Sequence, residues 1–123
     1  MADPRYKKLA EVLTGYSTVL KKGDTVLFDI TDTPEAFAVE LVRAARRRGA
    51  IPLVETRSAR VGREMLMNTS EQHAKTVRDI ELNRMKKCDA YVAVRGSHNA
   101  TENSDIPSNN LSMYSRTLRP VLN

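Results

Sequence analysis

The sequence predicts a small α/β domain of three layers, a Rossmann-like fold in which helices flank a mostly parallel sheet of about three strands. Short apolar runs at 25–30, 51–55 and 89–95 alternate with longer segments in which apolar residues recur every three or four positions. The run at 25–30 shows little alternation of apolar and polar residues, which is typical of a strand buried on both faces. Strands separated by helices pair in parallel through right-handed crossovers.

The first helix is predicted from Pro4 to about residue 22. Asp3 can cap its N-terminus, and Pro4 suits the first helical position. One face of this helix is apolar, with residues at steps of three and four, namely Tyr6, Leu9, Leu13, Tyr16 and Leu20. Two lysines followed by Gly23 place cations near the negative end of the helix dipole and a glycine at its left-handed cap.

The second helix is predicted over 34–48, between the first two strands. Thr33 is the expected N-cap, and Pro34 the first helical residue. The helix ends in three arginines and Gly49, the same cationic end and glycine as in the first helix.

Further helices are predicted at 57–67, 70–87 and 109–119, and a polar loop at 96–107. Thr69 and Gln72 have the spacing of a capping box at the start of the helix at 70–87.

Length and composition favour one soluble domain of 123 residues. No apolar run approaches the about 20 residues of a membrane span, and no basic start followed by an apolar stretch marks a signal peptide. The single cysteine, Cys88, excludes an internal disulfide and a cysteine-based zinc site. We therefore expect a cytoplasmic protein that does not bind membranes.

A charge of +5, equal to the net charge of the chain, lies within 43–64, where seven arginines outnumber Glu55 and Glu64. The seven arginines of this cluster are Arg43, Arg46, Arg47, Arg48, Arg57, Arg60 and Arg63. Such a cluster can attract phosphate, although a solvated helix end beside a loop has the same composition. No Tyr or Phe lies between residues 38 and 90 to stack on bases. We expect no specific binding of nucleic acid.

Polar side chains follow the strands at the edge where ligands collect in open parallel sheets. These candidate cleft-lining residues are Thr31, Asp32, Arg57, Ser97, His98 and Asn99. A small anion can bind at such helix starts, but the same residues also cap helices and form turns. No glycine-rich nucleotide motif follows the first strand, and His73 and His98 do not form a zinc-binding His-Glu-x-x-His pattern. We assign no catalytic residue and no metal ligand.

Four segments are similar to the thermophilic metalloprotease family, the group of aminopeptidase T and aminopeptidase S. They are Tyr6–Ala10, Lys21–Leu27, Phe37–Pro52 with its Arg-Gly-Ala passage into a strand, and Asp89–Asn99 with its Asn-containing loop. The resemblance implies cytoplasmic, dimeric, metal-dependent aminopeptidases that use two divalent ions (zinc, cobalt or magnesium). It places the metal ligands and the catalytic Glu in a C-terminal domain, and no catalytic residue of the family falls on a position of this chain.

We therefore expect residues 1–123 to be a single, non-catalytic α/β domain, the N-terminal part of a longer enzyme that removes N-terminal amino acids from peptides. Alone, the chain is expected to bind no cofactor and to be inactive. The alternative is a stand-alone α/β module that binds a phosphate-bearing ligand through the strand ends and the arginine cluster.

A sheet of three strands has two edges, and the strands at 25–30 and 89–95 carry little of the charge that protects natural edges. Unless something covers the two edges, other strands can pair with them, and we expect the chain to form a homo-oligomer through edge pairing or through an apolar helix face.

Overall fold

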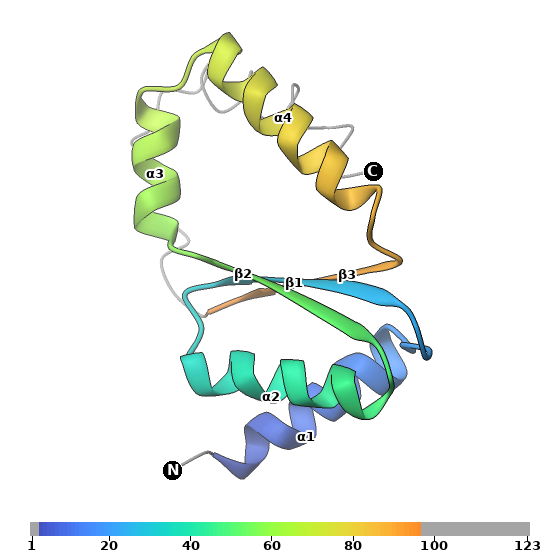
Figure 1. The fold of residues 1–123 in the computed structure, drawn as a ribbon. Coiled ribbons are helices and arrows are strands. Elements are labelled where there is room, and N and C mark those ends of the chain that lie inside the picture. Colours follow the sequence, from blue (N-terminus) through green and yellow to red (C-terminus); the bar gives the residue numbers. More distant parts are fainter. Residues whose placement is uncertain (1–2, 97–123) are drawn as a thin grey trace. The chain divides into compact units, whose positions relative to one another are not determined.

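The structure is a computed structural model that describes residues 3–96 (Figure 1). Its elements are α1 (Pro4–Val12), the π-helical turn η1 (Leu13–Ser17), β1 (Thr25–Thr31), α2 (Glu35–Arg47), β2 (Ile51–Arg57), α3 (Ala59–Met67), α4 (Glu71–Met85) and β3 (Ala90–Arg95). The α/β class and the parallel sheet of three strands are confirmed. The predicted loop at 96–107, apart from Gly96, and the helix predicted at 109–119 lie outside the described residues.

The chain divides into two compact units. The first contains 1–57 and 88–96, and therefore the sheet with α1, η1 and α2. The described part of the second is 58–87, which holds α3 and α4. Over residues 3–96, no helix combines the length and the apolar character needed to cross a membrane.

The sheet has the order β2-β1-β3, and β1 pairs in parallel with both neighbours. The strand at 25–30 is therefore the central strand, and β2 and β3 are the edges among the described strands. The continuous apolar run of β1 reflects its central place, because a central strand in a parallel sheet has helices or side chains over both faces. Thr25 starts the pairing with β3, since its N–H donates to Asp89 Oδ2 at 2.8 Å and its carbonyl accepts from the Asp89 N–H at 2.7 Å.

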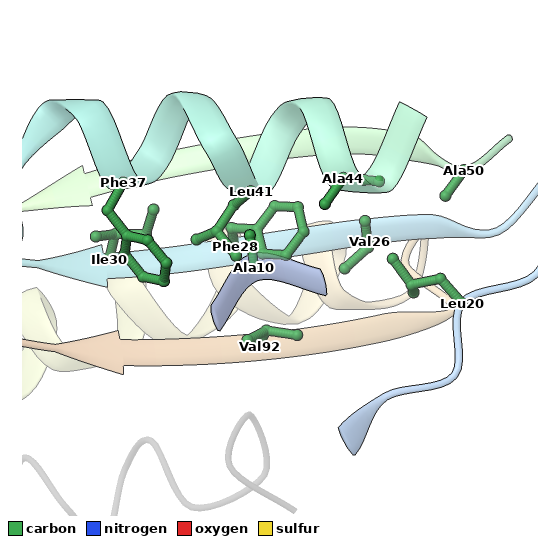
Figure 2. Packing of buried hydrophobic residues seen from close by; sticks show 11 residues of the cluster. Ala10, Leu20, Val26, Phe28, Ile30, Phe37, Leu41, Ala44, Ala50 and Val92 are labelled. Atoms are coloured by element: carbon green, nitrogen blue, oxygen red, sulfur yellow. The ribbon is translucent and has the colours of Figure 1, made fainter. Parts of the chain in front are cut away.

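The core lies between one face of the sheet and the helices α1 and α2, as Figures 1 and 2 show. Alternate residues of β1, which are Val26, Phe28 and Ile30, reach this face together with Val92 of β3. Side chains of Ala10, Leu20, Phe37, Leu41 and Ala44 cover them. The remaining residues of β1, such as Leu27 and Asp29, belong to the opposite face because strand side chains alternate.

The first helix is shorter than predicted, because α1 gives way to the π turn η1 and helical structure stops at Ser17. Tyr6 and Leu13 pack on the core as expected, but Leu9 is 48% and Tyr16 83% exposed. A π turn advances by a smaller angle per residue than an α-helix. Tyr16 is therefore rotated away from the core face that a regular helix would give it.

Two predicted helix caps are shifted by one residue. Pro34, in extended conformation, is the N-cap of α2 in place of Thr33, so no side chain caps this helix and Thr33 Oγ1 is buried without a hydrogen-bond partner. The N-cap of α4 is Ser70, whose hydroxyl accepts from the His73 N–H at 3.0 Å. The Thr69 hydroxyl instead lies 3.1 Å from His73 Nδ1.

Replacement of Gly49 by alanine is expected to lower the free energy of unfolding by about 1–2 kcal/mol, because Gly49 has a left-handed φ of +75° that a Cβ disfavours. A Cβ there would also lie 3.0 Å from Lys22 Cγ. Gly62→Ala is the matched control, since Gly62 lies within α3 with open space around it and alanine favours a helix by about 1 kcal/mol. Urea unfolding of both variants measures the difference, and equal losses would contradict it.

The cap of α1 is expected to depend on pH. Hydrogen bonds from the side chain and the backbone N–H of Arg5 hold the pKa of Asp3 below its usual value of 3.8. A lowered pKa in the folded state stabilises the protein above the unfolded pKa, and this contribution is lost as the pH falls through the folded value. Asp3→Ala should therefore destabilise the chain most at pH 7, and this effect should shrink as the pH falls from 7 toward 2. A constant difference between the thermal midpoints of the two proteins across this range would contradict the prediction.

Candidate functional site at the carboxyl edge of the sheet

The structure brings together Thr31, Asp32 and Arg57, three of the six residues predicted to line a cleft. Thr31 and Arg57 are register partners at the ends of β1 and β2. The Asp32 N–H donates to the Arg57 carbonyl at 3.0 Å, so the chain leaves β1 still joined to β2. The other three candidates, Ser97, His98 and Asn99, lie outside the described residues. Gly96, directly before them, donates its N–H to the Thr31 carbonyl at 2.8 Å.

Asp32 has a left-handed backbone conformation, with φ at 53°. Asp and Asn adopt this conformation more readily than other residues with a Cβ, because their short polar side chains can hydrogen-bond locally. The turn at Asp32 redirects the chain from β1 toward α2. The turn therefore accounts for the left-handed conformation of Asp32, and no role in binding is needed to explain it.

A carboxylate that is not among the six predicted cleft-lining residues connects the strands before this edge. Asp29, in the middle of β1, accepts from Arg57 Nε of β2 through Oδ1 at 2.7 Å and from the Tyr91 hydroxyl of β3 through Oδ2 at 2.7 Å. The Asp29 side chain is 17% exposed. One carboxylate thus connects all three strands on the face opposite the core. The signal in the sequence is that Asp29 is the one charged residue in an otherwise apolar strand.

This contact determines where the Arg57 side chain lies. Arg57 pairs in register with Thr31, but its guanidinium reaches Asp29, two residues earlier in β1. The guanidinium therefore extends back over the sheet and does not extend beyond its carboxyl edge. Arg57 was also predicted to begin a helix, whereas β2 continues to Arg57 and Ser58 caps α3. Arg57 acts as a strand residue and as an ion-pair partner.

The arginine cluster does not form one phosphate site. Four of its seven members make ion pairs, which are Arg43–Glu40 at 3.0 Å, Arg47–Glu11 at 2.6 Å, Arg57–Asp29 at 2.7 Å and Arg63–Glu64 at 3.5 Å. The Arg48 guanidinium lies against the backbone of Gly15, where a Cβ would collide with it. The cluster is also divided between the two units. The alternative of a stand-alone module for a phosphate-bearing ligand is not supported.

Within residues 3–96, no group of three or more His, Cys, Asp and Glu side chains is placed to hold a metal ion. His73 contacts the Thr69 hydroxyl at the start of α4, and Cys88 is half-buried. The described residues therefore do not fit a centre of two metal ions, and they supply no catalytic step through one.

Comparison with known proteins identifies a family and a similar fold. A family model described as Thermophilic metalloprotease (M29) matches residues 2–123. No curated protein matches the chain. Wild-type AmpT from Thermus thermophilus is a similar solved structure, with a TM-score of 0.71 and 21% sequence identity. The match covers 95% of this chain and 32% of that chain, so this chain spans about a third of the length of that protein.

Tyr91→Phe is expected to lower the free energy of unfolding by about 1 kcal/mol, because it removes one hydrogen bond to Asp29. Asp29→Ala should lower the free energy of unfolding by more, about 2 kcal/mol, since it removes the carboxylate that accepts hydrogen bonds from both Arg57 and Tyr91. In the Asp29→Ala background, Tyr91→Phe should have little further effect. A double-mutant cycle by urea unfolding measures this coupling, and strictly additive losses would show that the two side chains do not interact.

Proposed function

The chain belongs to the thermophilic metalloprotease (M29) family, and from this we propose that it is the N-terminal, non-catalytic domain of a longer metal-dependent aminopeptidase. The family match over nearly the whole chain carries the proposal. The match to AmpT supports the proposal that further domains belong to the enzyme, because this chain corresponds to about a third of the AmpT chain. We propose that residues 1–123 form one domain and that the parent enzyme removes N-terminal amino acids from peptides.

In this proposal the metal chemistry belongs to the remainder of the enzyme. Two divalent ions, of zinc, cobalt or magnesium, would there polarise the peptide carbonyl and activate a water molecule. The residues of this chain are proposed to pack beside the active site of the longer enzyme and to form one rigid side of its cleft. Thr31, Asp32 and Arg57, at the ends of β1 and β2, are the described residues proposed to line the cleft. Ser97, His98 and Asn99, proposed with them from the sequence, lie outside the described residues.

Rigidity of that edge is the property that the described contacts supply. Asp32 is tied to Arg57 through the backbone, and Arg57 is tied to Asp29 through its side chain. Residues that are already fixed lose little conformational entropy when a peptide binds. They can therefore hold the peptide in one orientation at low cost. We further propose a cytoplasmic, homo-oligomeric enzyme that acts on peptides and binds neither membranes nor specific nucleic acid.

The 123-residue chain is expected to release no amino acid from aminoacyl substrates, with or without added zinc, cobalt or magnesium. The reason is that its only two histidines, His73 and His98, are 25 residues apart in the sequence and form no metal-binding motif such as His-Glu-x-x-His. Fluorogenic aminoacyl amides measure the activity, and equilibrium dialysis measures the bound metal independently. A longer polypeptide that contains the family's catalytic region is the positive control. Metal-dependent hydrolysis by the 123 residues alone would contradict the proposal.

A further inference from the structure

Two arginines lie on either side of Thr31 at the carboxyl edge of the sheet. Thr31 of β1 is the register partner of Arg57 in β2 and of Arg95 in β3. Register partners in a parallel sheet direct their side chains to the same face, and Arg57 lies on the face opposite the core, as its contact with Asp29 shows. The side chain of Arg95 therefore starts from this face as well. Neighbouring strands are about 4.8 Å apart, which places the Cα atoms of the two arginines about 10 Å from each other.

The two arginines differ in whether a carboxylate holds their side chains. Arg57 Nε donates to Asp29 Oδ1 at 2.7 Å. Arg95 is exposed and forms no ion pair with a carboxylate in the described part of the chain. Both oxygens of Asp29 are already engaged, since Oδ2 accepts from the Tyr91 hydroxyl at 2.7 Å. A guanidinium stays protonated in proteins, so Arg95 presents a full positive charge to solvent at this edge.

The backbone of Arg95 is fixed, although its guanidinium is not held by an ion pair. β3 pairs with β1 as far as Arg95, and directly after it the Gly96 N–H donates to the Thr31 carbonyl at 2.8 Å. The base of the side chain therefore has a defined place along the edge. Arg95 also has no ion pair to break before it binds an anion, whereas Arg57 would have to leave the partly buried Asp29 without its countercharge, which is costly.

We propose that Arg95 binds a carboxylate of the peptide substrate, an inference that rests on the proposed function. Arg95 shares its edge of the sheet with Thr31 and Arg57, which are proposed to line the cleft. An aminopeptidase acts on the first peptide bond, so the amino end of the substrate lies at the metal ions and the rest of the peptide extends along the cleft. A guanidinium matches a carboxylate with two parallel N–H···O bonds, and such charge-assisted pairs are among the strong hydrogen bonds. The substrate class is therefore peptides with a carboxylate beyond their first residue, either the C-terminal group of a short peptide or an acidic side chain.

The charge of the two arginines suits one carboxylate and does not suit a polyanion. Asp29 neutralises Arg57, so that only Arg95 contributes a charge without a countercharge. Nucleic acid presents a series of phosphates and binds where several cations neutralise them together. A single carboxylate needs only one cation, and it leaves the Arg57–Asp29 ion pair intact.

The test measures kcat and KM of the longer enzyme that contains residues 1–123, with peptides that differ in one carboxylate. One series compares short alanine peptides of increasing length with their C-terminal amides. A second compares amidated peptides that carry glutamate or glutamine after the first residue, and the two series distinguish the two sources of the carboxylate. In at least one series the acid should have the lower KM. Arg95→Gln should raise the KM for that acid by about tenfold, the size of one hydrogen-bonded charge pair, and should leave its kcat and the KM for its neutral partner unchanged.

Arg46→Gln is the matched control, because Arg46 is also exposed but lies in the last turn of α2, at the opposite edge of the sheet. It removes the same charge and should leave every KM unchanged. Arg95→Lys keeps the charge without the planar fork, so its KM for the acid should lie between those of the wild type and Arg95→Gln.

The outcomes distinguish this inference from the proposed function. Equal KM values for acids and their neutral partners in both series would overturn the role of Arg95, while hydrolysis of these peptides would still support the proposed function. An equal rise in KM for acid and neutral peptides in Arg95→Gln, or the same effect in Arg46→Gln, would overturn that role as well. An enzyme that hydrolyses none of the peptides would overturn the proposed function, and this inference with it.

Discussion

The burial of β1 between two neighbouring strands is the constraint on which the rest of the first unit depends. Val26 and Phe28 are fully buried, and Leu27 and Ile30 nearly so. A strand buried in this way must pair its backbone on both sides, because unpaired backbone groups away from water are costly. Because β1 is apolar and buried, it needs a paired strand on each side, and β2 and β3 are these strands. The helices α1 and α2 in turn exist as stable elements because they cover one face of this strand.

Asp29 is the exception within this apolar strand, and its environment explains how it is accommodated. A carboxylate removed from water needs a countercharge and hydrogen bonds, since burial alone strongly disfavours its charge. Arg57 supplies the countercharge with one hydrogen bond, and Tyr91 supplies a second hydrogen bond. Both donors come from the strands that β1 requires for its own pairing. The polar contact thus fixes which residues of β2 and β3 lie beside the middle of β1.

Local signals in the sequence predicted the class of the fold and the approximate places of the three strands and the four α-helices among the described residues. The apolar runs locate all three strands, and the cationic end and glycine locate the end of α2. The order β2-β1-β3 and the Asp29 contact were not predicted, because both arise from pairing between residues far apart in the chain. The π turn at η1 was missed for another reason, since periodicity assumes a constant rotation per residue. The Pro34 cap shows that a preferred cap such as Thr33 can be displaced by one position.

The contacts of β2 with β1 determine where the last residue of β2 lies. The two strands pair in parallel from Ile51 to Arg57, and the Asp32 N–H donates to the Arg57 carbonyl beyond the end of β1. The Arg57 side chain is additionally held by Asp29, two residues before its register partner Thr31. Arg57 is thus held through both its backbone and its side chain, and a segment held in this way loses little conformational entropy when a ligand binds. The Arg57–Asp29 ion pair therefore helps to order the end of the sheet that is proposed to face a peptide.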